Sequence, residues 1–420
     1  MAGQDFAVVG QSLKKVDALE KVLGKARFGD DLSFPGMLYA KVFRSRVPHG
    51  MIKKLDVSKA YQVAGVHAVV TADDIPGSNT HGIIIKDEPV LVKDHIRKVG
   101  DPIAVVAAET KEACDRALAA IEVEIEELPA VFDPIEAMKE DAPKLYEKGN
   151  ILATCKIVKG DIEEGFRLSD VVVANRYRTV LLEHAYIEPE VCVATVEGDQ
   201  ITVWASTQNP HYDQKEIARN LGVNINKVRV IQAVTGGGFG GKLDLCAQVQ
   251  VALLAMKTGR PVKLVYSREE SIQCSSKRHP YIMEVKTGAR KDGKLMAFEA
   301  TLIADTGAYA SYGPGVLTRG AVHFTGPYEI PHVKITGYSV YTNNPTAGAM
   351  RGFGVPQVAF AHEQQMDQLA EKLGLDPVEF RLMNAFRPGS VTATGQVLEH
   401  SVGIRETIKQ AVAKAKELMG

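Results

Sequence analysis

The sequence predicts an α/β (α+β) protein, and three observations indicate this class. Short runs rich in β-branched and aromatic residues alternate with helical stretches along the chain. Residues 201–258 follow the order strand, helix, strand, glycine loop, helix. No internal repeat or low-complexity tract interrupts the alternation. A chain of 420 residues is long enough for two or three such domains.

The first expected domain covers residues 1–135. Its segments GMLYAKVFRS and HAVVTADDI predict strands separated by polar turns. Residues 101–128 predict a strand, an alanine-rich helix and a second strand. In that helix Ala113, Ala117 and Ala120 share one face, because they are spaced at i, i+4 and i+7.

Residues 136–160 carry charge, proline and glycine without clear periodicity, which predicts a surface linker. Residues 161–420 form the second expected domain. Within it, Asp292-Gly293 marks the turn of a β-hairpin. A basic amphipathic helix is expected over the last twenty residues.

Composition and charge exclude several classes of partner. The net charge is −1, the pI is about 6.8, and lysine and arginine are scattered, so no nucleic-acid or anionic-membrane partner is expected. No apolar run approaches the length of a membrane span, and the N-terminus lacks the layout of a signal peptide. None of the five cysteines forms a C-x-x-C pair, which disfavours an iron–sulfur or structural zinc site in this chain. A reducing, cytoplasmic location is therefore expected.

The glycine loop TGGGFGGK, residues 235–242, matches parts of two nucleotide-binding patterns. The phosphate-loop pattern requires a hydroxyl side chain at the position of Leu243, and leucine cannot hold Mg²⁺. The dinucleotide pattern requires an acidic residue about twenty positions later, and residues 256–265 contain none. What remains is a loop with five glycines whose amides can closely approach an anionic or metal-bound group.

A second motif is expected at the same edge of the sheet as the glycine loop. Residues 201–205 and 228–234 predict strands, and Asn209-Pro210 and Gly222 predict the two ends of the helix between them. If the strands are parallel neighbours, Thr207-Gln208-Asn209 and the loop emerge together where open α/β sheets bind ligands. The alternative is that both segments are ordinary turns between a strand and a helix.

Three motifs in order resemble those of a known family. Thr207-Gln208-Asn209, GGGFGGK and RGFGVPQ (351–357) are similar to motifs in the molybdenum-cofactor subunits of the xanthine dehydrogenase and aldehyde oxidoreductase family. The resemblance covers nearly the whole chain. It implies that the first domain is the family's α/β hammerhead domain and the second its first molybdopterin-binding domain.

The resemblance also implies cofactors and partners. The cofactor would be molybdenum–molybdopterin, in the dinucleotide form, with a terminal sulfido or selenido ligand. The family's second molybdopterin domain carries the catalytic glutamate in a G-x-G-E-type motif, which this sequence lacks. We therefore expect no catalytic base in this chain and a second molybdopterin subunit as partner. Further partner subunits would carry iron–sulfur clusters and FAD.

The resemblance assigns five residues to the cofactor. Gln208 aligns with a glutamine that bonds the apical ligand of the metal. The backbone amide of Phe239, flanked by Gly238 and Gly240, aligns with a second donor to that ligand. Arg351 aligns with an arginine beside the molybdenum. The surroundings of the metal are thus expected to include Gln208, Phe239 and Arg351, each acting through the metal's ligands.

Three residues are assigned to a small heterocyclic substrate by the same resemblance: Arg319, Phe353 and Leu243. Purine-hydroxylating members have glutamate at the position of Leu243, which disfavours xanthine. Carbon monoxide dehydrogenases have cysteine at the position of Gly348, which disfavours that chemistry. The combination indicates a flat ring that bears negative charge, and the resemblance is greatest to split members that hydroxylate nicotinate to 6-hydroxynicotinate using water.

Each site residue also has a purely structural interpretation. Gln208 would be a turn residue, Phe239 and Phe353 would be core residues, and Arg319 and Arg351 would form buried ion pairs.

The functional alternatives are a subunit of a purine- or aldehyde-oxidising member, a non-catalytic assembly subunit, and a nucleotide-binding protein. A metal site at His184 and Glu188, four residues apart, lacks a third ligand in the sequence pattern.

Overall fold

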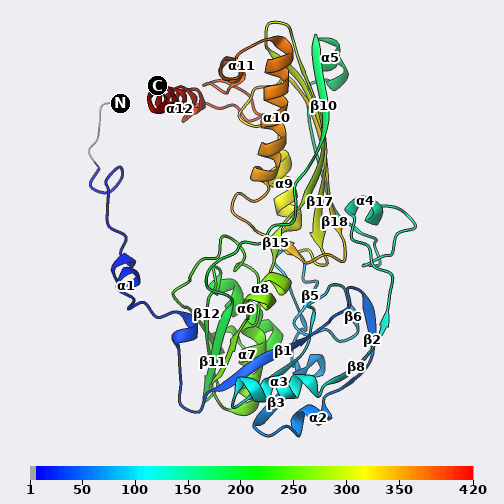
Figure 1. Cartoon of the computed structure of the whole chain (residues 1–420), viewed down its shortest axis with the longest axis vertical. Coiled ribbons are helices and arrows are strands. Elements are labelled where there is room, and N and C mark those ends of the chain that lie inside the picture. Colours follow the sequence, from blue (N-terminus) through cyan, green and yellow to red (C-terminus); the bar gives the residue numbers. More distant parts are fainter. Residues whose placement is uncertain (1–5, 420) are drawn as a thin grey trace.

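The computed structural model describes residues 6–419, which form two sheet-and-helix units arranged along the long axis of the molecule (Figure 1). The lower unit in that view contains a seven-stranded sheet. Its strand order is β13 (Val228–Gln232), β12 (Gln200–Ala205), β11 (Val191–Glu197), β14 (Val262–Val265), β1 (Leu38–Arg44), β7 (Pro102–Ala108) and β3 (Val66–Thr71).

The seven-stranded sheet is continuous across the two expected domains. Its strands β1, β7 and β3 come from the first sequence region, and the other four come from the second. The junction is a parallel pairing of β1 with β14, in which Leu38 lies opposite Val262. Both residues are buried in one hydrophobic core. The two regions therefore share a sheet and a core.

Helices cover both faces of this sheet. Helices α6 (Pro210–Leu221) and α7 (Gln248–Thr258) contribute to the hydrophobic core on one face. Helices α2 (Ser58–Tyr61) and α3 (Lys111–Ala119) contribute to the core on the other face. The α3 helix buries Ala113, Cys114 and Ala117 against the sheet, as its alanine spacing predicts. Every residue from Val249 to Ala255 in α7 is buried, so this helix lies in the interior rather than at the surface.

The upper unit is built on a long, twisted five-stranded sheet. Its order is β10 (Val171–Arg178), β16 (Tyr281–Ala289), β17 (Leu295–Gly307), β18 (His332–Tyr341) and β9 (Ile151–Lys159). Two helices pack on the sheet and share its core, α9 (Gly313–Val322) and α10 (Val355–Leu373). Because β17 and β18 are parallel, α9 is the crossover between them. The hairpin between β16 and β17 turns at Gly293, as predicted.

Smaller elements complete the fold. The strands are β2 (Gly50–Asp56), β6 (His95–Ile96) and β8 (Glu122–Glu127) in one sheet, and the pairs β4 (Thr80–His81) with β5 (Glu88–Pro89) and β15 (Lys277–Arg278) with β19 (Ala347–Gly348). The remaining helices are α1 (Ala18–Val22), α4 (Pro134–Ala137), α5 (Ile162–Arg167), α8 (Arg268–Cys274), α11 (Pro377–Asn384) and α12 (Ile404–Met419).

Two sequence-based expectations need correction. The expected linker, residues 136–160, ends in strand β9, which forms the edge of the five-stranded sheet. The exposure of its residues does not alternate cleanly, so periodicity did not reveal it. The helix after the glycine loop begins at Gln248 rather than directly after the loop, which leaves Leu245 in the preceding segment.

The first and last helices of the described residues lie away from the two units (Figure 1). The N-terminal arm that carries α1 extends beside the body, and the basic helix α12 lies at the same side (Figure 1). Neither helix buries a residue. Among residues 6–419, no helix has the length and apolar character needed to cross a lipid bilayer.

Candidate functional site

The site lies at the end of two parallel strands. Strands β12 and β13 pair in parallel, with Ala205 opposite Gln232. The T-Q-N motif follows β12, and the glycine loop follows β13, so both segments leave the sheet at the same edge. The parallel arrangement on which the sequence argument depended is confirmed.

The side chain of Gln208 binds the glycine loop directly. Its Oε1 atom accepts the backbone N–H of Gly240 at 3.0 Å and that of Lys242 at 3.3 Å. The Gln208 backbone N–H donates to the Lys242 carbonyl at 2.8 Å. A Cβ atom at Gly238 would lie 2.5 Å from the Gln208 Oε1. The loop therefore closes around this side chain only because glycine stands at position 238.

The underside of the loop is held by a buried ion pair. The Lys242 Nζ lies 3.0 Å from the Glu188 carboxylate, donates to the Ser206 hydroxyl at 2.7 Å, and stands over the Tyr186 ring. The same carboxylate accepts the N–H of Gly236 at 2.7 Å. The lysine side chain is only 1% exposed, so it points into the protein and not toward a ligand. The ion pair of Lys242 with Glu188 holds the loop in place, because removing one partner of a buried pair costs about 3–5 kcal/mol.

The outer surface of the loop presents hydrogen-bond donors. Four N–H donors have no acceptor within residues 6–419. They are the backbone amides of Gly237, Gly238 and Phe239 and the Nε2 atom of Gln208. Phe239 is 49% exposed and adopts a φ of +51°, so it is not a core residue. Free donors on a loop that excludes Cβ atoms fit a bound group that offers oxygen or sulfur acceptors.

The third motif packs on the glycine loop. The Arg351 N–H donates to the Phe239 carbonyl at 2.9 Å. A Cβ atom at Gly240 would lie 2.6 Å from the Ala349 carbonyl oxygen. That oxygen lies 2.8 Å from the His184 Nε2. His184 thus supports the backbone of the third motif, while Glu188 anchors the loop, which gives both members of the suspected metal pair a structural role.

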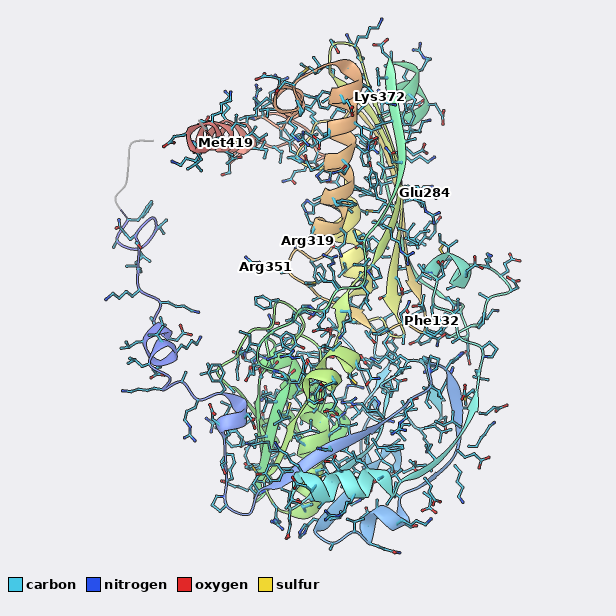
Figure 2. All side chains as sticks on the ribbon, in the orientation of Figure 1. Phe132, Glu284, Arg319, Arg351, Lys372 and Met419 are labelled. Carbon is cyan, nitrogen blue, oxygen red and sulfur yellow. The ribbon has the colours of Figure 1, made fainter. Side chains whose placement is uncertain are left out.

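The two candidate arginines are exposed. Neither Arg319 nor Arg351 forms an ion pair or a side-chain hydrogen bond with residues 6–419. Figure 2 places both on the same side of the molecule, beside α9 and α10. The alternative that they form buried ion pairs is therefore wrong for both, and their charge is available to another molecule.

Phe353 packs at the edge of the hydrophobic core of the upper unit. Its ring meets Tyr312 edge-on, with centroids 5.6 Å apart and an interplanar angle of 77°. The ring also lies against Gly315 of α9, where a Cβ atom would be 3.3 Å away. Phe353 is half-buried and has a φ of +53°. Burial raises the pKa of Tyr312 to about 12, so its hydroxyl stays protonated at neutral pH.

The two positions that distinguish family members have clear surroundings. Leu243 is half-buried, and its N–H closes a turn onto the Gly240 carbonyl. A Cβ atom at Gly348 would lie 2.8 Å from the Asp244 carboxylate and 2.9 Å from the Ser311 hydroxyl. A larger residue there would have to displace these side chains, so glycine at this position suits the packing.

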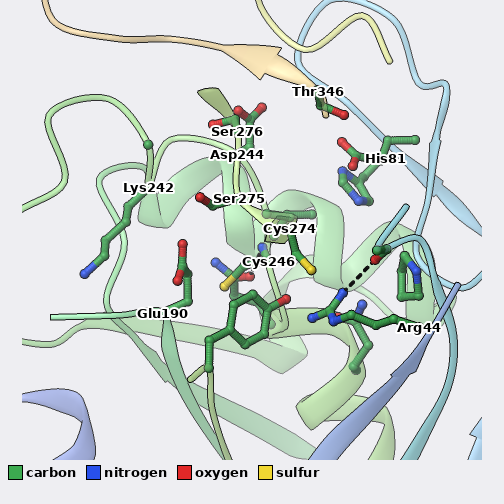
Figure 3. Close-up of a pocket in the computed structure, with 18 of the residues that line it drawn as sticks. Arg44, His81, Glu190, Lys242, Asp244, Cys246, Cys274, Ser275, Ser276 and Thr346 are labelled. Atoms are coloured by element: carbon green, nitrogen blue, oxygen red, sulfur yellow. Dashed lines mark hydrogen bonds between the residues drawn. The ribbon is translucent and has the colours of Figure 1, made fainter. Parts of the chain in front are cut away.

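A polar cavity of about 50 Å³ lies beneath the loop (Figure 3). Arg44, Glu190, Lys242 and Asp244 are among the residues that line it. A volume of this size holds a few water molecules, which buried polar groups without protein partners require. The Glu190 Oε2 and the Arg44 Nε are such groups.

Backbone strain is concentrated around the site. Five non-glycine residues with positive φ occur in residues 6–419, and four of them are Ala185, Phe239, Ser311 and Phe353. Each such residue costs roughly 1–3 kcal/mol, and such strain clusters at functional sites. Ser311, Asp244 and Tyr312 were not identified from the sequence, because no motif contains them.

Comparisons with known proteins identify the family of this chain. The family model of the molybdopterin cofactor-binding domain matches residues 145–385. The family model of the aldehyde oxidase and xanthine dehydrogenase a/b hammerhead domain matches residues 23–129. The chain is 52% identical over 419 residues to the nicotinate dehydrogenase large molybdopterin subunit of Eubacterium barkeri, covering 100% of this chain and 99% of that one.

Solved structures show the same fold at about twice the length. The aldehyde oxidoreductase of Desulfovibrio gigas superposes with a TM-score of 0.91 at 34% identity, over 96% of this chain and 46% of that one. Quinoline 2-oxidoreductase of Pseudomonas putida 86 superposes with a TM-score of 0.90 at 27% identity, over 98% and 55%. The chain thus belongs to the xanthine dehydrogenase and aldehyde oxidoreductase family of molybdenum enzymes, as a molybdopterin-binding subunit.

Proposed function

We propose that this chain forms one half of the active site of a heteromeric molybdenum hydroxylase, and that the assembled enzyme converts nicotinate to 6-hydroxynicotinate with water as the oxygen source. The single observation that carries the proposal is the set of free donors on the glycine loop, the Phe239 amide and the Gln208 Nε2, at the edge of the sheet. The named relative that is 52% identical supports the substrate.

The residues present fit the cofactor. Gln208 and the Phe239 amide would donate hydrogen bonds to ligand atoms of the cofactor, and Arg351 would add positive charge. The glycines at 238 and 240 let the loop pack closely, because neither position has space for a Cβ atom. When bound, the molybdenum group would act as a Lewis acid and supply the oxygen nucleophile and the two-electron acceptor. We propose the dinucleotide form, with a sulfido or selenido ligand.

The substrate would lie against residues of this chain. The Phe353 ring offers an apolar face, and Leu243 offers a second apolar contact that cannot accept a hydrogen bond from a purine. The unpaired Arg319 guanidinium would bind a carboxylate or stabilise negative charge that develops on the ring. A pyridine carboxylate satisfies all three residues.

The proposal includes partner subunits. A second molybdopterin subunit would supply the catalytic glutamate, and iron–sulfur and FAD subunits would carry electrons away. The relatives of twice the length and the exposed Gln208 and Phe239 support this division. We also propose two domains, with a boundary near residue 135. The matched ranges 23–129 and 145–385 support such a boundary, and strand β9 places the later part of residues 136–160 with the second domain rather than in a linker. Five free thiols suit a reducing cytoplasm.

The experiment that tests the proposal measures molybdenum by elemental mass spectrometry in the complex purified from its own source. About one molybdenum per copy of this chain, with turnover of nicotinate exceeding that of xanthine and of a neutral aldehyde, supports it. Molybdenum with preferred turnover of xanthine or aldehyde would assign another substrate. An intact complex without molybdenum would identify this chain as a non-catalytic assembly subunit.

A further inference from the structure

The carboxylate of Asp244 is bonded to the hydroxyl of Ser311. The Ser311 Oγ lies 3.0 Å from both carboxylate oxygens. Ser311 is only 2% exposed, so its hydroxyl is shielded from bulk solvent. Figure 3 shows Asp244 at one end of the polar cavity, next to Ser276. This contact joins the segment after the glycine loop to the start of helix α9.

Ser311 occupies a conformation that its side chain disfavours. Its φ is +38°, in the left-handed region that non-glycine residues rarely adopt. Such a residue persists only where the surroundings hold it. Ser311 packs tightly against Gly348. A Cβ atom at position 348 would lie within 2.9 Å of the Asp244 carboxylate, the Ser276 Cβ and the Ser311 hydroxyl.

The turn at Ser311 determines where helix α9 begins and what it presents. The next residue, Tyr312, is the N-cap of α9, and its ring meets Phe353 edge-on. Arg319 lies in the last turn of the same helix, roughly 10 Å from its start at the usual rise per residue. The helix is also fixed from outside, since a Cβ atom at Gly354 would lie 2.5 Å from the Val316 carbonyl.

We propose that Asp244 is a positioning residue of the substrate pocket. By holding Ser311 in its left-handed turn, it sets the Tyr312 ring, and through that ring the face of Phe353 against which a flat substrate lies. The inference rests on the proposed function for the substrate, and on the structure alone for the position of the rings.

Four variants of the assembled complex separate the hydroxyl contact from the backbone turn. Asp244→Asn keeps one acceptor oxygen for Ser311, whereas Asp244→Ala and Ser311→Ala remove the contact. Ser311→Gly also removes the hydroxyl but adopts positive φ without strain. We expect Asp244→Ala and Ser311→Ala to raise the KM for nicotinate about tenfold, with a smaller change in kcat. Asp244→Asn and Ser311→Gly should lie much closer to the wild type.

A second measurement does not depend on activity. In crystal structures of the Asp244→Ala and Ser311→Ala variants, φ at position 311 should become negative, and the Tyr312 and Phe353 rings should leave their arrangement of 5.6 Å and 77°. The matched control is Asp305→Ala. Asp305 is also a buried carboxylate, but it accepts the Thr342 hydroxyl at 2.7 Å outside the pocket, so its replacement should leave both rings in place.

The outcomes are distinguishable. If Asp244→Ala assembles with unchanged rings and an unchanged KM, the positioning role is refuted. If Asp244→Ala does not assemble, the comparison of Ser311→Gly with Ser311→Ala decides, and equal behaviour of these two refutes it as well. A wild-type complex that rejects nicotinate would end the proposed substrate, while the crystal structures would still decide whether Asp244 sets the rings.

Discussion

The side-chain oxygen of Gln208 accepts the backbone N–H of Gly240 at 3.0 Å, so the oxygen of this amide group faces the loop and its NH2 does not. One side chain thus has two functions. The oxygen holds the loop in place, and the nitrogen remains a free donor on the outer surface. These two functions can be separated by mutation.

The variant Gln208→Glu should keep the loop but lose the outward donor. A carboxylate oxygen still accepts the amides of Gly240 and Lys242, while its second oxygen replaces an N–H donor with an acceptor. Removing one preorganised hydrogen-bond donor to a transition state typically lowers the rate by about 10²–10³-fold. We expect kcat of this variant to fall by about that factor. The measurement is steady-state kinetics at matched molybdenum content, and full activity would show that the Nε2 donates to nothing in the reaction.

The variant Gly238→Ala should lose the cofactor rather than slow the reaction. Its Cβ atom would lie 2.5 Å from the Gln208 Oε1, so the loop must open or the glutamine must move. Molybdenum content of the purified complex should fall to a small fraction of the wild-type value. The matched control is Gly403→Ala, where no atom lies within 4 Å of the new Cβ, and it should retain its molybdenum. Equal molybdenum in both variants would contradict the expectation.

Arg319→Met should discriminate between substrates by charge. The exposed guanidinium has no protein partner within residues 6–419, so its loss leaves the fold intact. Turnover of nicotinate should fall about tenfold or more, because a charge-assisted hydrogen bond contributes roughly 1.5–3 kcal/mol. Turnover of a neutral aldehyde should change much less. Parallel losses on both substrates would remove Arg319 from the substrate pocket.

Asp213 should make the protein less stable as the pH rises from about 4 to about 7. Burial raises the pKa of this carboxyl to about 7, while in the unfolded chain it is near 3.8. Between these values the folded state holds a proton that the unfolded state has lost, so the free energy of unfolding falls with rising pH. The difference of about three units corresponds to about 4 kcal/mol at most.

The test of this pH dependence is chemical denaturation of the wild type and of Asp213→Asn across the same pH range. The two should have similar stability at pH 4, and the variant should be more stable at pH 8. Curves that run parallel from pH 4 to pH 8 would show that Asp213 does not cause the slope.

The part of the site that lies along one stretch of sequence could be predicted from local signals. Asn209-Pro210 and Gly222 define the ends of α6, and the glycine loop follows the next strand, as the structure confirms. The contact between Asp244 and Ser311 could not be predicted, because the residues are 67 positions apart and neither belongs to a motif. The left-handed turn at Ser311 is likewise a product of packing and not of its own preference.

The same distinction holds for the fold. Individual strands such as β1 and β12 follow from their composition, but the parallel pairing of Leu38 with Val262 joins segments that no local pattern relates. The alternative that Arg319 and Arg351 form buried ion pairs was wrong for a similar reason. An arginine in an apolar stretch suggests a buried pair, whereas Arg319 lies at the open end of α9, where the crossover turns toward β18.

The continuous seven-stranded sheet bears on how the polypeptide can be divided in the laboratory. Residues 145–420 expressed alone would keep β9 but lack β1, β7 and β3, and β14 would then present an unpaired row of backbone N–H and C=O groups. The strand is short but its residues Val262, Lys263 and Leu264 are buried in the intact chain. An exposed edge of this kind is a template for pairing between molecules. The fragment should therefore aggregate, and the smallest soluble form of the cofactor domain should include the hammerhead.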